Sequence, residues 1–250
     1  MKELPLFPLS AVLLPGGRMP LQIFEQRYLD LVRESMRNDS PFGMVWIRRG
    51  SEVAQRGRAA SELGDYGTCA RIVDWDQLPN GLLGITIAGE ERFDLYHTGL
   101  RSNGLVTGEV VMRAPQEPAP MLPAWHSFAE LLRSLETHPH VQRLRLQVDY
   151  GDAWQVAYTL LQLLPLDEAV KYHLLGLDGV EGVMAELDGI LNRISEGSLL
   201  SARSMHPGSW KCIAAGRCSM VAGVSPRYSP STSTAQSISV EEMVAWRALW

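Results

Sequence analysis

Apolar and polar residues follow different spacings in the two halves of this chain. Up to about residue 113 the spacing favours strands, because apolar runs and alternating apolar positions are bounded by glycine, proline and asparagine. The predicted strands cover residues 42–47, 68–76, 82–88, 92–98 and 105–113. One helix is predicted at residues 27–38, where apolar side chains recur at three- and four-residue steps.

Prolines punctuate the first part of the chain. Two short apolar segments, each interrupted by proline, flank a bend at Pro15, Gly16 and Gly17. Proline removes a backbone donor and fixes φ, and glycine adopts positive φ without steric cost. We therefore expect edge or barrel-closing strands here that complete a small β-domain.

Turn residues order the later strands as an antiparallel meander. Asn80-Gly81 supplies the positive φ values of a tight hairpin, and Gly89-Glu90 is interpreted as a second turn. The polar stretch 51–65 is expected to be a surface loop. Such a meander is long enough to curl into a partly closed barrel.

Helical spacing dominates the second half. Three prolines within residues 114–120 predict a linker, since proline disfavours both helix and ladder. Beyond it, residues 125–135 have one amphipathic face, and Asp152 is the expected N-cap of a helix that Pro165 ends. Two further helices are predicted, at residues 167–175 and 180–194.

Several dispersed segments together resemble the Lon protease N-terminal, substrate-binding domain. They are Leu-Phe-Pro-Leu at 6–9, Leu-Pro-Gly at 14–16, Ile-Phe-Glu-Gln-Arg-Tyr at 23–28, and Leu-Leu-Pro-Leu-Asp-Glu at 163–168. The likeness spans roughly residues 4–194 and is strongest to the stand-alone bacterial form without ATPase or peptidase modules. Gln26 departs from the family, which often has proline there.

The resemblance implies an α+β fold: an N-terminal PUA-like antiparallel β pseudo-barrel followed by a small helical bundle. The expected divisions are a β-domain at 1–113, a Pro-rich linker at 114–121, a helical subdomain at 122–196 and a divergent, poorly ordered tail at 197–250. The tail matches nothing in the family and lacks a sustained apolar period until about residue 240. A displaced reading frame is one possible origin for it.

Charge and cysteine content narrow the class of protein. The net charge is −5, and residues 198–250 hold five basic and two acidic residues, so the first 197 residues carry −8. Such an acidic body is a poor surface for nucleic acid. Three cysteines imply no disulfide framework, and we find neither a signal peptide nor an apolar run of the roughly 18 residues that a membrane span needs. We expect a cytoplasmic protein that does not associate with membranes.

Motifs for catalysis are missing from the sequence. It has no phosphate-binding loop and no Gly-x-Ser-x-Gly elbow, so we predict a protein that is not an enzyme and needs no cofactor. His138 and His140 lack further metal ligands nearby in the sequence. Asp74 and Asp76 are interpreted as solvent-exposed residues at the base of a hairpin. No metal site is therefore predicted. Cys69 is expected to be a buried, inert thiol.

Large apolar residues near the first helix are the candidate peptide-binding set. Phe24, Tyr28, Met44 and Trp46 could line a groove that accepts an extended apolar peptide, although plain core packing accounts for each of them as well. Glu25 and Arg27 are expected to be structural, as an ion pair that ties the first helix to the barrel.

The resemblance favours a non-catalytic module that binds unfolded or degron-bearing polypeptides and is linked to protein quality control. A protease or a chaperone would be its partner. An RNA-binding module is the alternative, because PUA-like folds commonly bind RNA, but the acidic body and the lack of a basic stripe count against it. A cryptic hydrolase is the third class, and no nucleophile–base pair supports it.

Overall fold

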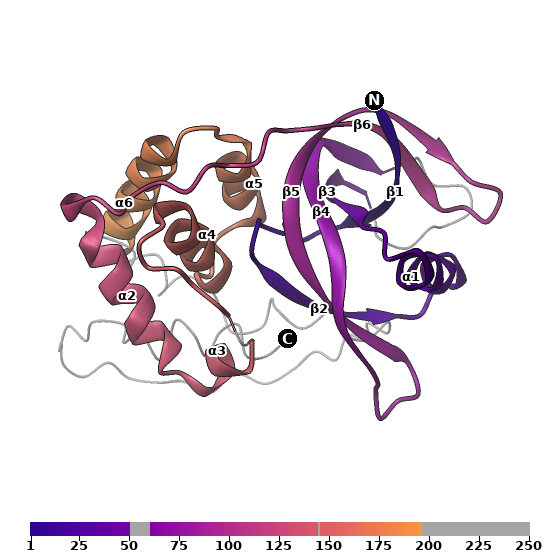
Figure 1. Cartoon of the computed structure of the whole chain (residues 1–250), viewed down its shortest axis with the longest axis horizontal. Coiled ribbons are helices and arrows are strands. Elements are labelled where there is room, and N and C mark those ends of the chain that lie inside the picture. The colour runs from indigo at the N-terminus through magenta and orange to yellow at the C-terminus, as the bar shows by residue number, and fades with distance from the viewer. Residues whose placement is uncertain (51–60, 145, 197–250) are drawn as a thin grey trace, which may run out of the picture.

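A computed structural model describes residues 1–50, 61–144 and 146–196 of the chain. It contains a sheet that curls into a near-barrel and a group of helices beside it (Figure 1). The predicted tail at 197–250, with Cys212 and Cys218, lies outside the described residues, as does most of the loop predicted at 51–65.

Six strands form one sheet in the order β2-β5-β4-β3-β1-β6, and an additional β5–β6 pairing closes the ring. The strands are β1 (Lys2–Leu9), β2 (Arg18–Ile23), β3 (Phe42–Arg49), β4 (Glu62–Gln77), β5 (Leu83–Leu100) and β6 (Val106–Met112). The α+β class and the pseudo-barrel are confirmed. The sheet is mixed rather than purely antiparallel, because β1 pairs with β3 in parallel.

The N-terminal strands take two different positions. β1 lies between β3 and β6 and so helps to close the ring, whereas β2 pairs only with β5 among the described strands. At the end of β2, the Gln162 side chain contacts both backbone polar groups of Arg18: its Oε1 accepts from Arg18 N at 3.2 Å and its Nε2 donates to Arg18 O. A helix residue thus occupies part of the sheet edge.

The turn predicted at Gly89-Glu90 is wrong, because β5 runs through it as one strand. Here the segment after β1 crosses the sheet: Gly16 N donates to Gly89 O, and Gly89 N donates to Gly17 O, both at 2.9 Å. A Cβ at Gly89 would collide with the carbonyl oxygen of Leu14. The glycine therefore permits a close backbone approach rather than a turn. Likewise, β4 begins at Glu62, inside the predicted loop.

Helix α1 (Gln26–Asn38) packs against the barrel, as Figure 1 shows. Its buried face, with Tyr28, Leu31 and Val32, joins a core cluster that includes Phe7, Phe42, Ile85 and Ile87. The helix ends at Asp39, whose positive φ of 46° places it in the left-handed region. The prediction of a helix at 27–38 is confirmed to within one residue.

The second half of the chain contains the helices η1 (Pro123–Trp125), α2 (His126–Glu136), α3 (Pro139–Arg143), α4 (Ala153–Leu163), α5 (Glu168–Gly176) and α6 (Val180–Glu196). The predicted N-cap is confirmed, since Asp152 Oδ1 accepts from Trp154 N at 3.1 Å. Helices α2, α5 and α6 match the predicted spans closely, while α3 was not predicted. Apolar residues from all of the longer helices form one large core cluster.

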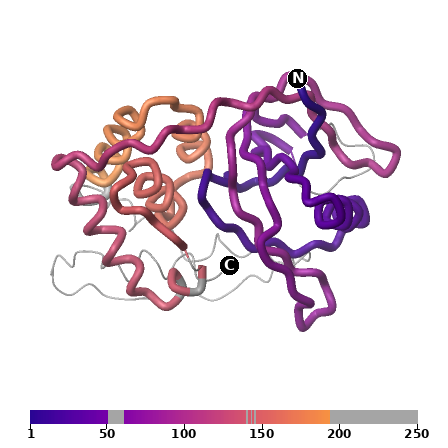
Figure 2. The backbone as a smooth tube through the Cα atoms, in the orientation of Figure 1, coloured from indigo at the N-terminus to yellow at the C-terminus, as the bar shows by residue number. Residues whose placement is uncertain are grey.

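The barrel and the helices share part of this core. Val12 and Leu14, from the segment between β1 and β2, pack within the helical cluster. Figure 2 shows this segment extending from the sheet to the helices. Its position is held by a hydrogen bond from Val12 N to Glu168 Oε2 of 2.7 Å. The N-terminal residues therefore fix the helices against the β-domain.

Candidate functional site

Two of the predicted peptide-binding residues lie in the barrel core. Tyr28 is 5% exposed and its ring stacks on Phe7 with the centroids 4.0 Å apart, and Met44 belongs to the same buried cluster. Both side chains stabilise the packing of α1 and β3. Neither offers surface to a ligand in this structure.

The other two predicted residues lie elsewhere. Trp46 is half-buried against the helical cluster, and its Nε1 donates to Ser10 O at 3.2 Å. Phe24 follows β2 and is 60% exposed. Of the four, only Phe24 presents a largely free apolar side chain, and its peptide-binding role stays a prediction.

Glu25 and Arg27 form a partly buried ion pair of 3.0 Å at the start of α1. Arg27 Nη1 also donates to Gly104 O at 3.2 Å, in the loop between β5 and β6. The guanidinium lies 4.5 Å from the centroid of the Tyr28 ring. These contacts join the start of α1 to the barrel. They are the kind of contact expected if Glu25 and Arg27 serve to tie the helix to the barrel.

A groove with both polar and apolar lining residues lies between the end of α1 and β4, with a volume of about 320 Å³. Met36, Val73 and Trp75 line it and are all exposed, Trp75 to 59%. Arg71 borders the groove, but its guanidinium is paired with Asp39 at 2.7 Å and Glu90 at 2.6 Å. The groove thus combines three exposed apolar side chains with a charged rim, in which Arg71 is paired and Asp74 forms no ion pair among the described residues.

Sequence reasoning missed this groove. The only signal was a tryptophan between two aspartates, Asp74 and Asp76, near the turn of a predicted hairpin. Both aspartates are exposed, and each accepts a hydrogen bond from the next backbone N–H, at 2.9 Å and 2.7 Å. Trp75 pairs with Ile85 of β5 and lines the groove together with the end of α1. Only the fold shows that Met36 meets it.

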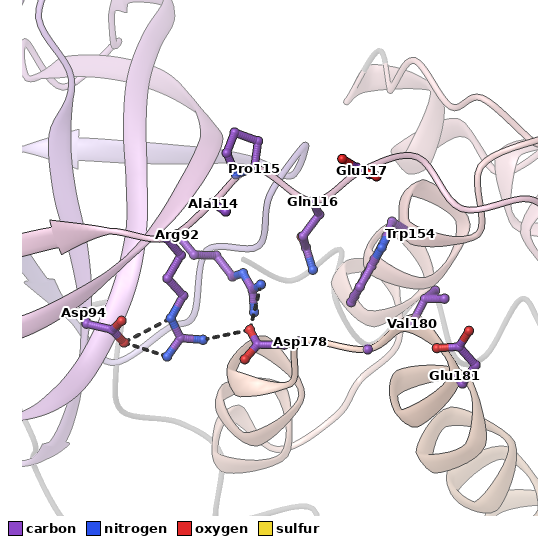
Figure 3. Close-up of a pocket in the computed structure, with 12 residues that line it drawn as sticks. Arg92, Asp94, Ala114, Pro115, Gln116, Glu117, Trp154, Asp178, Val180 and Glu181 are labelled. Atoms are coloured by element: carbon purple, nitrogen blue, oxygen red, sulfur yellow. Dashed lines mark hydrogen bonds and ion pairs between the residues drawn. The ribbon is translucent and has the colours of Figure 1, made fainter.

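A second, larger cleft of about 640 Å³ lies between the β-domain and the helices (Figure 3). It is lined by Arg92, Asp94, Arg113, residues 114–117, Trp154 and residues 178–181. These residues come from β5, the residue after β6, the linker, α4, the loop between α5 and α6, and the start of α6. The cleft therefore exists only because the two halves of the chain pack together.

Two arginines of the cleft bind the C-terminal end of α5. Arg92 is 5% exposed, and its Nη1 donates to Leu175 O at 2.9 Å and Leu177 O at 2.7 Å. Arg113 donates to Gly176 O at 3.2 Å and pairs with Asp94 at 2.6 Å. Carbonyl groups at a helix C-terminus lack partners within the helix and carry a partial negative charge, so cations stabilise them. The arginines thereby attach α5 to the sheet.

Side chains with catalytic or metal-binding chemistry are not gathered in the described residues. Cys69 is buried, and burial raises the pKa of its thiol to about 12, so the thiolate is scarce at neutral pH. Within the same residues, no three histidine, cysteine or carboxylate side chains have metal-binding geometry. None of the described helices has the length and apolar character needed to cross a membrane.

Comparison with solved structures supports the fold. The structure of a Lon N-terminal domain protein from Xanthomonas campestris is 34% identical, with a TM-score of 0.61, and the match covers 76% of this chain and 98% of that one. The N-terminal domain of the Mycobacterium avium complex Lon protease is 16% identical, with a TM-score of 0.53 over 74% of this chain and 96% of that one, which shows the fold alone.

Sequence comparison gives the family. Lon protease 2 of Myxococcus xanthus is 33% identical, and the match covers 45% of this chain and 12% of that protein. Lon protease of Anaeromyxobacter dehalogenans is 31% identical, and the match covers 36% of this chain and 10% of that protein. The chain thus matches about a tenth of the length of these relatives, and no peptidase or ATPase module is shown in its described residues. The sequence model of the ATP-dependent protease La (LON) substrate-binding domain matches residues 3–181. The chain therefore belongs to the Lon substrate-binding domain family.

Proposed function

We propose that this chain is a non-catalytic module that binds unfolded or degron-bearing polypeptides in protein quality control. The observation that carries the proposal is the match of residues 3–181 to the Lon substrate-binding domain. A protease or a chaperone that receives the bound polypeptide is the partner class that fits. The buried free thiol of Cys69 suits the reducing cytoplasm as its compartment.

The groove between α1 and β4 is the surface that we assign to this binding. Unfolded polypeptides differ from folded ones chiefly in exposing apolar side chains, and burying one such side chain fully contributes about 1.5–3 kcal/mol. Met36, Val73 and Trp75 provide an exposed apolar surface that can cover such a group. Arg71 is already paired with Asp39 and Glu90, so a peptide need not neutralise it, and the exposed carboxylate of Asp74 can stay in contact with water.

The boundaries of the module follow the sequence divisions: β-domain 1–113, linker 114–121 and helical subdomain 122–196. The helical subdomain depends on the β-domain, because Val12 and Leu14 contribute to its core. We therefore expect the two parts to fold together. The purified protein is expected neither to hydrolyse ATP nor to cleave casein.

Binding to a permanently unfolded protein tests the proposal. Reduced, carboxymethylated α-lactalbumin, labelled with a fluorophore, would be titrated with the full chain and followed by anisotropy, with native α-lactalbumin as the folded control. We expect binding of the unfolded form only, and a loss of about tenfold in affinity, or about 1.4 kcal/mol, in a Met36→Ala/Trp75→Ala variant.

The matched control variant is Tyr96→Ala, which removes an aromatic side chain of similar exposure outside the groove. Its affinity should equal that of the unchanged chain. Equal binding of native and unfolded α-lactalbumin, or no binding of either, would contradict the proposed function. Recovery of nuclease-sensitive material from cell extract in place of polypeptides would favour the RNA-binding alternative.

A further inference from the structure

The last part of β4 has a free edge. On one side β4 pairs with β3 up to Ala70, which lies opposite Phe42, the first residue of β3. On the other side the pairing with β5 continues to Gln77, and Figure 1 shows this end of the hairpin projecting at the bottom of the view. Residues 71–77 therefore have no partner strand on the β3 side among the strands that the structure describes. An edge of this kind offers backbone N–H and C=O groups to another strand.

The groove between α1 and β4 runs along this edge. It is lined by the consecutive residues 71–75 of β4. Successive side chains of a strand point to opposite faces of the sheet, so a groove that touches each of these five residues follows the edge of the strand rather than one face. Asp39 and Ser40, which precede β3, line the groove from the other side. The groove thus occupies the position that β3 would fill if it extended back past Phe42.

Two backbone donors on this edge bind the side chains next to them. Trp75 N donates to Asp74 Oδ1 at 2.9 Å, and Gln77 N donates to Asp76 Oδ1 at 2.7 Å. Antiparallel pairing uses the backbone groups of alternate residues, so the N–H groups of Trp75 and Gln77 face the same edge, the one away from β5. Both aspartates are exposed, so each carboxylate can turn to water and leave its N–H to the carbonyl group of a peptide.

The apolar residues of the groove lie beside these donors. Val73 and Trp75 are two residues apart in β4 and so point to the same face of the sheet. Both are exposed, and Met36 at the end of α1 lines the groove with them. A strand added along the edge would place every second side chain on this face, close enough to the β4 side chains for contact.

The outer edge of β2 is not available in the same way. Gln162 already binds the backbone N–H and C=O of Arg18. Two residues further along the same edge, Pro20 has no N–H to donate. The end of β4 is therefore the better template for an added strand.

We propose that the bound polypeptide joins the sheet as an additional strand along residues 71–77 of β4. Its backbone forms hydrogen bonds with Trp75 and Gln77, and every second side chain packs on the apolar face of the groove. This inference rests on the proposed function and specifies the form of the ligand. The groove takes an extended segment in which apolar side chains alternate with others, and the backbone of that segment contributes to the affinity.

Backbone methylation of the ligand tests the hydrogen bonds. The probe is an uncharged, fluorescently labelled peptide in which valine and threonine alternate, titrated with the full chain and followed by anisotropy. In an added strand the N–H groups of alternate residues face β4, and the others face solvent. N-methylation of all valines or of all threonines therefore removes donors from one edge only. We expect one methylated peptide to bind about tenfold more weakly and the other to stay within about twofold of the unmodified peptide.

Replacing the two aspartates tests the edge of β4 itself. Asp74→Ala/Asp76→Ala leaves the N–H groups of Trp75 and Gln77 without their carboxylate acceptors, so the unmodified peptide should bind about fivefold more tightly. The matched control, Glu130→Ala/Glu186→Ala, removes the same charge at two exposed helix positions outside the groove. Its affinity should equal that of the unchanged chain, because the peptide carries no charge.

The outcomes separate this inference from the proposed function. Equal affinities of the two methylated peptides overturn strand addition, and so does unchanged or weaker binding by Asp74→Ala/Asp76→Ala. Binding of unfolded α-lactalbumin, with its loss in the Met36→Ala/Trp75→Ala variant, would still support the proposed function in that case. Failure of the unchanged chain to bind both the unmodified peptide and unfolded α-lactalbumin overturns the proposed function and this inference together.

Discussion

The rings of Tyr66 and Tyr172 stack face to face, with centroids 4.1 Å apart and planes only 2° from parallel. Tyr66 belongs to β4 and Tyr172 to α5, so this pair joins the barrel to the helices. Tyr66 Oη donates to Tyr172 O at 2.9 Å, and Tyr172 Oη accepts from Asp65 N at 2.8 Å. The Tyr66 side chain thus binds the backbone of α5, and the Tyr172 side chain binds the backbone of β4.

Replacing Tyr172 should therefore destabilise the whole fold. Tyr172→Ala removes a buried ring and is expected to lower the free energy of unfolding by about 3 kcal/mol. Tyr172→Phe keeps the stack but leaves Asp65 N without its acceptor, for a loss of about 1 kcal/mol. Urea denaturation followed by circular dichroism measures both. Tyr96→Ala, at an exposed position, should change the value by less than about 0.5 kcal/mol.

The second prediction concerns Arg92, whose buried guanidinium binds the carbonyl groups after α5. Arg92→Met leaves these acceptors without donors and should cost about 3 kcal/mol of unfolding free energy. Arg101→Met is the matched control, because Arg101 forms a partly exposed ion pair with Glu34 that should contribute less than about 1 kcal/mol. Similar urea midpoints for the two variants would show that the buried arginine does not attach α5 to the sheet.

Local sequence patterns predicted most of the helices and strands. They could not predict contacts between segments that are distant in the sequence. Helix α4 could be predicted because its N-cap, apolar face and terminal proline are adjacent in sequence. Gly89 was assigned to a turn because a glycine in a strand pattern has the same local signal whether the chain turns or another backbone crosses it. The difference lies in residues 14–17, more than seventy positions away.

The same limit applies to the candidate sites. Tyr28 and Trp75 are both aromatic residues in amphipathic surroundings, and only the fold decides that one is buried and the other exposed. The cleft requires Arg92, Glu117 and Trp154 to meet from three different elements. No spacing in the sequence connects them, so neither the groove nor the cleft could be predicted.

The third prediction contrasts two of the residues proposed from sequence. Tyr28→Ala should lower the free energy of unfolding by about 3 kcal/mol, because the ring is buried against Phe7. Phe24→Ala should change it by less than about 0.5 kcal/mol, since the side chain is largely exposed. Both are measured by urea denaturation. A stable Phe24→Ala variant can then be tested for binding unfolded α-lactalbumin, whereas weakened binding by Tyr28→Ala would be ambiguous.

The last prediction is a loss of stability at alkaline pH that depends on Tyr66. Burial, followed by the nearby Tyr172, raises the pKa of Tyr66 from 10.0 to about 12. The folded state thus holds the phenol proton more tightly than the unfolded chain does. Its contribution to stability is complete below pH 10 and is lost as the pH rises from 10 through 12.

Tyr66→Phe isolates this contribution, because phenylalanine keeps the stacked ring and has no proton to lose. Other tyrosines titrate in both proteins and cancel in the comparison. We expect the unchanged chain to lose unfolding free energy relative to Tyr66→Phe as the pH rises above 10, while the difference between them stays constant from pH 7 to 9. Urea midpoints at each pH give the comparison. A difference that stayed constant up to pH 12 would mean that the Tyr66 phenol ionises as readily in the folded protein as in the unfolded chain, and that its bond to Tyr172 O does not hold the proton in place.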